Sequence, residues 1–88
     1  MKGKIEEIKE QLGDQRYEAS VGGGMVRAIV TGRLEVESIR IEPEVMDDAD
    51  MLQTMVCAAV NEAIRKAQDA LKERIAELTG GLNLPGLT

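Results

Sequence analysis

The sequence predicts a small α+β protein with the element order helix, three-stranded antiparallel sheet and long helix. Apolar residues recur every three or four positions in Met1–Leu12 and again in Asp50–Leu78, which is the period of one helix face. Between these segments apolar residues alternate with polar ones, which is typical of strands. Glycine-containing turns separate the alternating segments, as in antiparallel hairpins. We expect one domain over residues 1–79 and a tail rich in Gly, Leu and Pro over residues 80–88.

The first predicted helix, Met1–Leu12, is short and amphipathic. Ile5, Ile8 and Leu12 share one face, and the remaining positions are mostly Lys and Glu. Gly13-Asp14 ends the helix. A free helix of this length is marginal in water, so we expect it to pack on another element.

Three strands are predicted next, over Arg16–Val21, Met25–Thr31 and Leu34–Ile41. Gly22-Gly23-Gly24 and Gly32-Arg33 form the turns between them. The three glycines do not predict a phosphate loop, because the Lys-Ser/Thr pair and the helix that follow such loops are absent. In the third strand the apolar phase changes near Glu37-Ser38, which predicts a β-bulge. Pro43 closes this strand, and a helical turn is expected near Val45-Met46.

The long helix, Asp50–Leu78, is the strongest prediction. Asp50 followed by Gln53 resembles a capping box, and Gly80-Gly81 ends the run. The helix would span roughly 43 Å at about 1.5 Å per residue. A seven-residue strand covers only about 23 Å. Part of the apolar face must therefore extend past the sheet, and a second copy of the chain would cover it. The predicted dimer-interface residues are Val60, Ile64, Ala67, Leu71 and Ile75.

Composition also favours a dimer. The chain has 88 residues, no Phe, no Trp and a single Tyr, Tyr17. Chains of this size bury only about 60–65% of their unfolded surface, so a core without large aromatic side chains is marginal. Association of two chains would supply the missing apolar contacts.

The residues that usually carry catalysis are few. The sequence contains no His, and no base can be assigned to Ser20 or Ser38. The carboxylates of Asp47, Asp48 and Asp50 do not fit a calcium loop and are better explained as helix caps. We therefore predict no enzyme activity, no cofactor and no metal site.

The single cysteine, Cys57, lies at the edge of the apolar face of the long helix. We predict that it is buried and structural, like a small hydrophobic residue, rather than a reactive thiol. One cysteine cannot form an internal disulfide, and no apolar run is long enough to span a membrane. These two features predict a cytoplasmic protein without a membrane partner.

Motifs along almost the whole chain resemble those of the YbaB/EbfC nucleoid-associated proteins. The matching segments are Glu6-Glu7-Ile8-Lys9-Glu10-Gln11-Leu12, Gly22-Gly23-Gly24-Met25-Val26, Gly32, Ile39-Arg40-Ile41-Glu42-Pro43-Glu44, Asp47-Asp48 to Met51-Leu52, Val56-Cys57-Ala58-Ala59-Val60-Asn61-Glu62-Ala63 and Gly81-Leu82-Asn83-Leu84-Pro85-Gly86. The resemblance implies a cytoplasmic, nucleoid-associated homodimer. Such a dimer would bind duplex DNA with little sequence preference, and could influence nucleoid organisation and gene expression.

The net charge of −5 is unusual for a DNA-binding protein, so binding would require the cations to gather on one surface. The candidate DNA-binding residues are Lys2, Lys4, Lys9, Arg65, Lys66, Lys72 and Arg74. A dimeric protein-interaction module, with a protein partner and no direct contact to DNA, is the alternative. The sequence does not distinguish these two functions.

Overall fold

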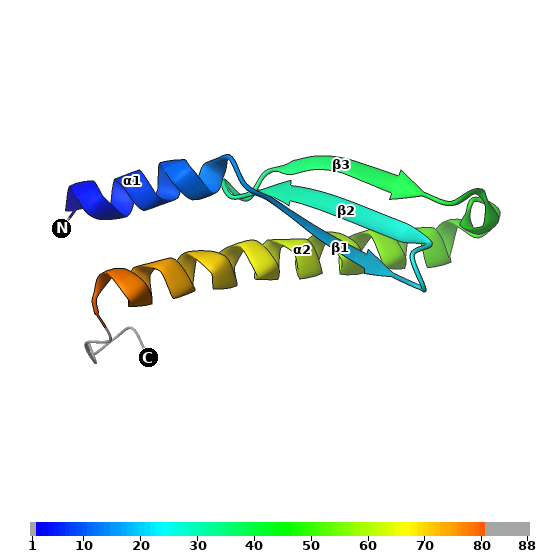
Figure 1. Ribbon diagram of the computed structural model, residues 1–88. Helices are drawn as coiled ribbons and strands as arrows, with labels where there is room; N and C mark the ends of the chain where they lie inside the picture. Colours follow the sequence, from blue (N-terminus) through cyan, green and yellow to red (C-terminus); the bar gives the residue numbers. More distant parts are fainter. Residues whose placement is uncertain (1, 81–88) are drawn as a thin grey trace.

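The computed structural model describes residues 2–80. Its elements are α1 (Lys2–Gly13), β1 (Arg16–Val21), β2 (Val26–Thr31), β3 (Val36–Ile41), the 3₁₀ turn η1 (Pro43–Val45) and α2 (Ala49–Leu78) (Figure 1). This order confirms the predicted α+β fold. The leucines of the predicted tail lie outside the described residues.

The strands form one antiparallel sheet in the order β1-β2-β3. Because side chains alternate across a sheet, the register aligns three apolar rows on the face towards α2. The rows are Tyr17-Val30-Val36, Ala19-Ala28-Ile39 and Val21-Val26-Ile41. The opposite face, which we call the outer face, includes the row Ser20-Arg27-Arg40.

The predicted β-bulge is confirmed. Ile29 pairs with Ser38 and Val30 pairs with Val36, so Glu37 is the extra residue on β3. The bulge keeps Val36 on the same face as Ile39. The strand starts later than predicted, because Leu34 belongs to the preceding turn and has a φ of 64°.

The core lies between α2 and the strands β1 and β2, and it consists of small side chains. Three alanines spaced one helical turn apart on α2, Ala59, Ala63 and Ala67, are buried. Ala59 and Ala63 pack with the buried residues of the two strands, which are Ala19, Val26, Ala28 and Val30, and Ala67 lies one turn further along the helix. Alanine has no side chain beyond Cβ, so these contacts let the helix lie close to the sheet.

Helix α2 extends well past the sheet, as its length predicts. Its 30 residues correspond to about 45 Å, against about 20 Å for a six-residue strand. The projecting half lies beside α1, with which α2 makes contacts (Figure 1). A second copy is therefore not the sole partner of the projecting half, because α1 of the same chain covers part of it.

The helix cap differs from the prediction by two residues. Helix α2 begins at Ala49, and its N-cap is Asp48, whose Oδ1 accepts a hydrogen bond from the Met51 amide at 3.0 Å. The capping box at Asp50 was therefore wrong, although a carboxylate of the same cluster does cap the helix. At the other end, Gly80 adopts a φ of 66° and its amide donates to the Glu77 carbonyl at 3.1 Å.

Gly32 is the point where α1 meets the sheet. Its amide donates to the Gln15 carbonyl at 3.0 Å, and a Cβ on Gly32 would overlap the Leu12 carbonyl. The obstructing groups, the Leu12 carbonyl and the Gly13 amide nitrogen, are backbone, so neither can rotate away. Gly32→Ala is therefore expected to lower the free energy of unfolding by about 1–3 kcal/mol, as overpacking does. Urea denaturation measures this change.

The matched control is Gly3→Ala in α1, where an added Cβ meets no atom within 4 Å. This substitution should be neutral or stabilise the helix by up to about 1 kcal/mol. Equal effects of the two substitutions would show that the contact at Gly32 does not constrain the fold.

Candidate functional site

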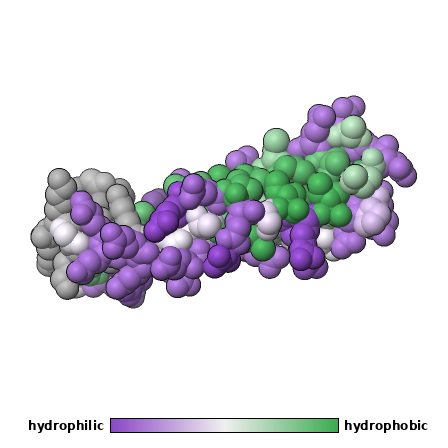
Figure 2. All heavy atoms as spheres, turned by 90° about the horizontal axis from the view of Figure 1, so that it is seen from above, coloured by the Kyte–Doolittle hydropathy of each residue, from purple (hydrophilic) through white to green (hydrophobic). Residues whose placement is uncertain are grey.

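The most prominent surface of the molecule is an apolar patch on β3. Val36, Ile39 and Ile41 point to the helix side of the sheet, yet they are 47%, 39% and 37% exposed. Their row neighbours on β2, Val30, Ala28 and Val26, are fully buried. Figure 2 shows hydrophobic residues gathered over the strands, while the half formed by the projecting helices is hydrophilic. Helix α2 thus covers two strands and leaves the third open.

The flank of α2 on the side of β3 is also apolar. The other flank lies beside β1, because the Lys66 ammonium donates to the Glu18 carbonyl at 2.8 Å. At 100° per residue, the predicted interface residues Val60, Ile64, Leu71 and Ile75 lie on the side of the helix away from Lys66. All four are half-buried, and Val60 and Ile64 pack partly against the core.

The remaining predicted interface residue, Ala67, is buried within the chain. It lines a cavity of about 300 Å³ together with Leu71, Gln68 and the turn residues Gly32, Arg33 and Leu34. The cavity extends the apolar surface from β3 to the start of the projecting half of α2. We call the surface formed by Val36, Ile39, Ile41, Val60, Ile64 and Leu71 the β3–α2 face.

Cys57 is exposed, so the prediction that it is buried within this chain was wrong. It precedes Val60 by three residues and Ile64 by seven, which places it on the same flank of α2. Helical periodicity found this flank correctly, but it could not show that the sheet stops short of covering it.

The predicted DNA-binding residues of α2 differ in how far they are already engaged. Arg65 makes an ion pair with Glu62 at 2.8 Å, and Arg74 makes one with Glu77 at 3.4 Å. Lys66 is bound to the β1 backbone. Lys72 is exposed and has no ion pair among residues 2–80. Arg65 and Lys66 also line an open depression of about 560 Å³ between β1 and α2.

The other three predicted DNA-binding residues, Lys2, Lys4 and Lys9, belong to α1. Their side chains lie outside the described part of the structure. The backbone of α1 nevertheless places them in the projecting half of the molecule, beside the stretch of α2 that holds Lys72 and Arg74 (Figure 1). We call α1 together with the stretch of α2 that holds Lys72 and Arg74 the helical arm.

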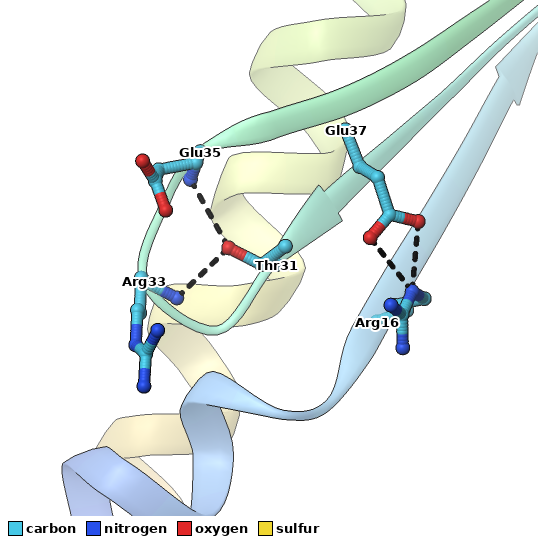
Figure 3. Close-up of polar contacts among 5 residues, drawn as sticks. All are labelled: Arg16, Thr31, Arg33, Glu35 and Glu37. Atoms are coloured by element: carbon cyan, nitrogen blue, oxygen red, sulfur yellow. Dashed lines mark hydrogen bonds and ion pairs between the residues drawn. The ribbon is translucent and has the colours of Figure 1, made fainter.

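The outer face of the sheet holds cations that the sequence prediction omitted. The Arg16 Nε donates to both carboxylate oxygens of Glu37, at 2.7 and 2.8 Å (Figure 3). This hydrogen bond and the negative charge of Glu37 raise the pKa of Arg16. Arg27 and Arg40 lie directly opposite each other on β2 and β3. The two-residue alternation of the strands was the signal that could have identified these residues.

The turn before β3 is closed by Thr31, whose hydroxyl oxygen accepts from the amides of Arg33 and Glu35 (Figure 3). The side chain of Arg33 lies against Gly13, at the C-terminal end of α1. A cation there interacts favourably with the carbonyls at the helix end. Arg33 therefore contributes to holding α1 against the sheet.

No cluster of His, Cys, Asp or Glu suited to a metal ion occurs among residues 2–80. None of the helices in that range has the length and apolarity needed to cross a membrane.

Comparison with known proteins assigns the chain to a family. Residues 1–82 match the model of the YbaB/EbfC DNA-binding family. A nucleoid-associated protein of Pelotomaculum thermopropionicum is 48% identical over 82 residues, which cover 91% of this chain and 78% of that protein. A nucleoid-associated protein of Thermoanaerobacter is 46% identical over 89 residues, which cover 99% of this chain and 80% of that protein.

The fold also has a match among solved structures. The crystal structure of an uncharacterized protein from Helicobacter pylori superimposes with a TM-score of 0.79 at 22% identity, covering 89% of this chain and 93% of that one. At this identity the match concerns the fold alone. The family-model match over nearly the full length and the two close relatives show that the chain belongs to the YbaB/EbfC DNA-binding family.

Proposed function

We propose that this protein binds duplex DNA as a homodimer with little sequence preference. In this role it would be a nucleoid-associated protein that affects nucleoid organisation and gene expression. The match of residues 1–82 to a DNA-binding family carries the proposal for DNA. The exposed apolar β3–α2 face carries the proposal for a dimer.

The β3–α2 face supports a second copy of this chain as its partner. Apolar side chains of β3 and of one flank of α2 adjoin each other there. A small protein gains stability when association with a second copy buries such a patch. A two-fold dimer would bury the same residues of both chains, because the patch pairs with itself. The dimer would also place two helical arms in one particle.

The helical arms support DNA contact despite the net charge of −5. Lys2, Lys4, Lys9 and Lys72 lie on helices that project from the sheet, and dimerisation doubles their number. Lysines contact phosphates as point charges, and phosphate contacts carry no sequence information. Binding through such residues is therefore tolerant of sequence.

A gel-shift titration of a duplex at several salt concentrations tests the proposal. Each neutralised phosphate releases counterions, so the logarithm of affinity should fall against the logarithm of salt with a slope of roughly −0.9 per contact. With few basic residues per chain, we expect a total slope of about −2 to −4. Unlabelled duplexes of unrelated sequence should compete about equally.

Two results would contradict the proposal. If a sample that is shown to be dimeric does not retard a duplex at low salt, the protein-interaction module is favoured instead. Competition by a single preferred sequence would show that base contacts, rather than phosphate contacts, dominate binding.

The thiol of Cys57 reports on the dimer. In one chain it is exposed, but it lies on the flank of α2 that a second copy would cover. We therefore expect a thiol-specific reagent to modify Cys57 at least about tenfold more slowly in the dimer than in urea, because covered thiols are inert. Labelling at the rate of a free thiol in a dimeric sample would place the interface elsewhere.

A further inference from the structure

The register of the sheet brings two arginines together on its outer face. Among the residue pairs that lie directly opposite each other, Arg27 and Arg40 form the single pair in which both side chains are charged, and the charges are alike. Directly opposed side chains have Cβ atoms about 4.5–5.5 Å apart, and like charges at that spacing repel. Neither guanidinium makes an ion pair with a carboxylate in the described part of the chain.

The surroundings of this pair form a shallow site. Arg27, Arg40 and Ile41 line a depression of about 310 Å³ together with Gly24 and Glu42. The Arg27 Nη2 lies 3.5 Å from the position that a Cβ on Gly24 would take, so the guanidinium extends over the glycine turn. Gly24 has a φ of 93° and no side chain, which leaves this approach open. The third member of the row, Ser20, adds an exposed hydroxyl beside Arg27.

The other arginine of the outer face provides a contrast. Arg16 is held by Glu37 across β2, so its charge is neutralised by the protein itself. Arg27 and Arg40 lack such an ion-pair partner, although Glu42 also lines the depression. Two guanidinium groups without a carboxylate partner suit an oxyanion that can accept from both, and phosphate is the usual ligand of this kind.

We propose that Arg27 and Arg40 bind a phosphate of the DNA backbone, at a contact separate from the helical arms. This inference rests on the proposed function, since it names a second surface for the same ligand. Arg27 is the second residue of β2 and Arg40 the second to last of β3, so the pair lies at the end of the sheet far from the arms (Figure 1). The pair also lies on the face opposite α2, and the molecule is 50 Å long.

A backbone phosphate suits this site better than a free anion. Both arginines are exposed and the depression is shallow, so nothing encloses a small ion. A polyanion held by other contacts of the same dimer is present at high local concentration, which compensates for a weak single contact. The proposal therefore commits to duplex DNA and uses inorganic phosphate as a probe of the free-anion alternative.

The test compares the salt dependence of duplex binding for the wild-type dimer and for Arg27→Gln/Arg40→Gln. Loss of one phosphate contact per chain should make the slope of log affinity against log salt shallower by about 1–2. We expect about a tenfold loss of affinity at low salt, while circular dichroism and dimer mass remain unchanged. Arg27→Lys/Arg40→Lys keeps both positive charges but removes the planar, two-pronged donor groups of the guanidinium, so it should lose less affinity than the double glutamine variant.

Two controls separate this site from a general effect of charge. Arg16→Gln removes one positive charge from the same face, as Arg40→Gln does, but Arg16 is already paired with Glu37, so its loss should leave the slope unchanged. Glu42→Gln removes the negative charge of a residue that lines the depression and should tighten binding about two- to threefold. If the arginines affected binding only by stabilising the sheet, Glu42→Gln would not tighten binding.

The outcomes that overturn the inference differ from those that overturn the proposed function. If the wild-type dimer binds no duplex, the proposed function fails. If the wild type binds but Arg27→Gln/Arg40→Gln keeps the wild-type salt slope, the phosphate site is wrong and the proposed function stands. The same holds if Arg16→Gln weakens binding as much as Arg40→Gln. If inorganic phosphate raises the melting temperature of the wild type but not of the double variant, while duplex binding is equal, the ligand is a free anion and the assignment to DNA is wrong.

Discussion

Ile39→Asp is expected to convert the proposed dimer into folded monomers. Ile39 is 39% exposed in the single chain, so the substitution leaves the core of that chain intact. In the dimer the carboxylate would be buried without a partner, which costs several kcal/mol. A loss of about 4 kcal/mol corresponds to roughly a thousandfold weaker association. Light scattering at micromolar concentration should give the mass of one chain, 9.6 kDa.

Ile29→Asp is the matched control for this experiment. Ile29 is a half-buried isoleucine of the neighbouring strand, but it lies on the outer face of the sheet, opposite Ser38. The dimer should persist in this variant. If Ile29→Asp dissociates the dimer and Ile39→Asp does not, the two chains associate through the outer face.

Reversing the charges of Lys4, Lys9 and Lys72 in one variant is expected to abolish duplex binding. These lysines belong to the helical arm, and a dimer contains two copies of each. Replacing them by Glu removes phosphate contacts and adds repulsion, so the affinity at low salt should fall by at least about a hundredfold. Fluorescence anisotropy with a labelled duplex measures this loss.

The control uses the two arginines of α2 that carboxylates already hold. Arg65→Gln/Arg74→Gln removes guanidinium groups that pair with Glu62 and Glu77, and should weaken binding only slightly. If this variant loses as much affinity as the triple lysine variant, the arginines leave their ion pairs to contact DNA. Retained binding in the lysine variant would exclude the helical arm as the main contact.

The fold could be predicted because its signals are local. Helical and strand periodicities identified each element, and the change of phase near Glu37 identified the bulge before any pairing was known. Single-residue boundaries were less accurate. Asp48 and Asp50 carry the same carboxylate, and only the backbone geometry shows which of them precedes the first helical turn.

The candidate sites were harder to predict because they depend on contacts between distant residues. Cys57 lies on an apolar flank, but whether the sheet reaches that flank depends on which strands α2 covers. Arg27 and Arg40 are thirteen positions apart, and only the strand register sets them opposite each other. The sequence likewise could not show that Arg65 and Arg74 pair with Glu62 and Glu77.

The line of alanines on α2 has a consequence for temperature. The fully buried side chains of the described residues, Ala19, Val26, Ala28, Val30, Val45, Ala59, Ala63 and Ala67, are methyl and isopropyl groups. Larger side chains such as Leu52, Met55 and Ile64 are only partly buried against them. Unfolding such a chain exposes little apolar area, and the heat capacity change is correspondingly small. A small heat capacity change flattens the stability curve, and the small buried apolar area keeps its maximum low, so one chain is only modestly stable over a wide range of temperature. In the proposed dimer, association would supply much of the remaining stability, and the melting temperature would rise with protein concentration.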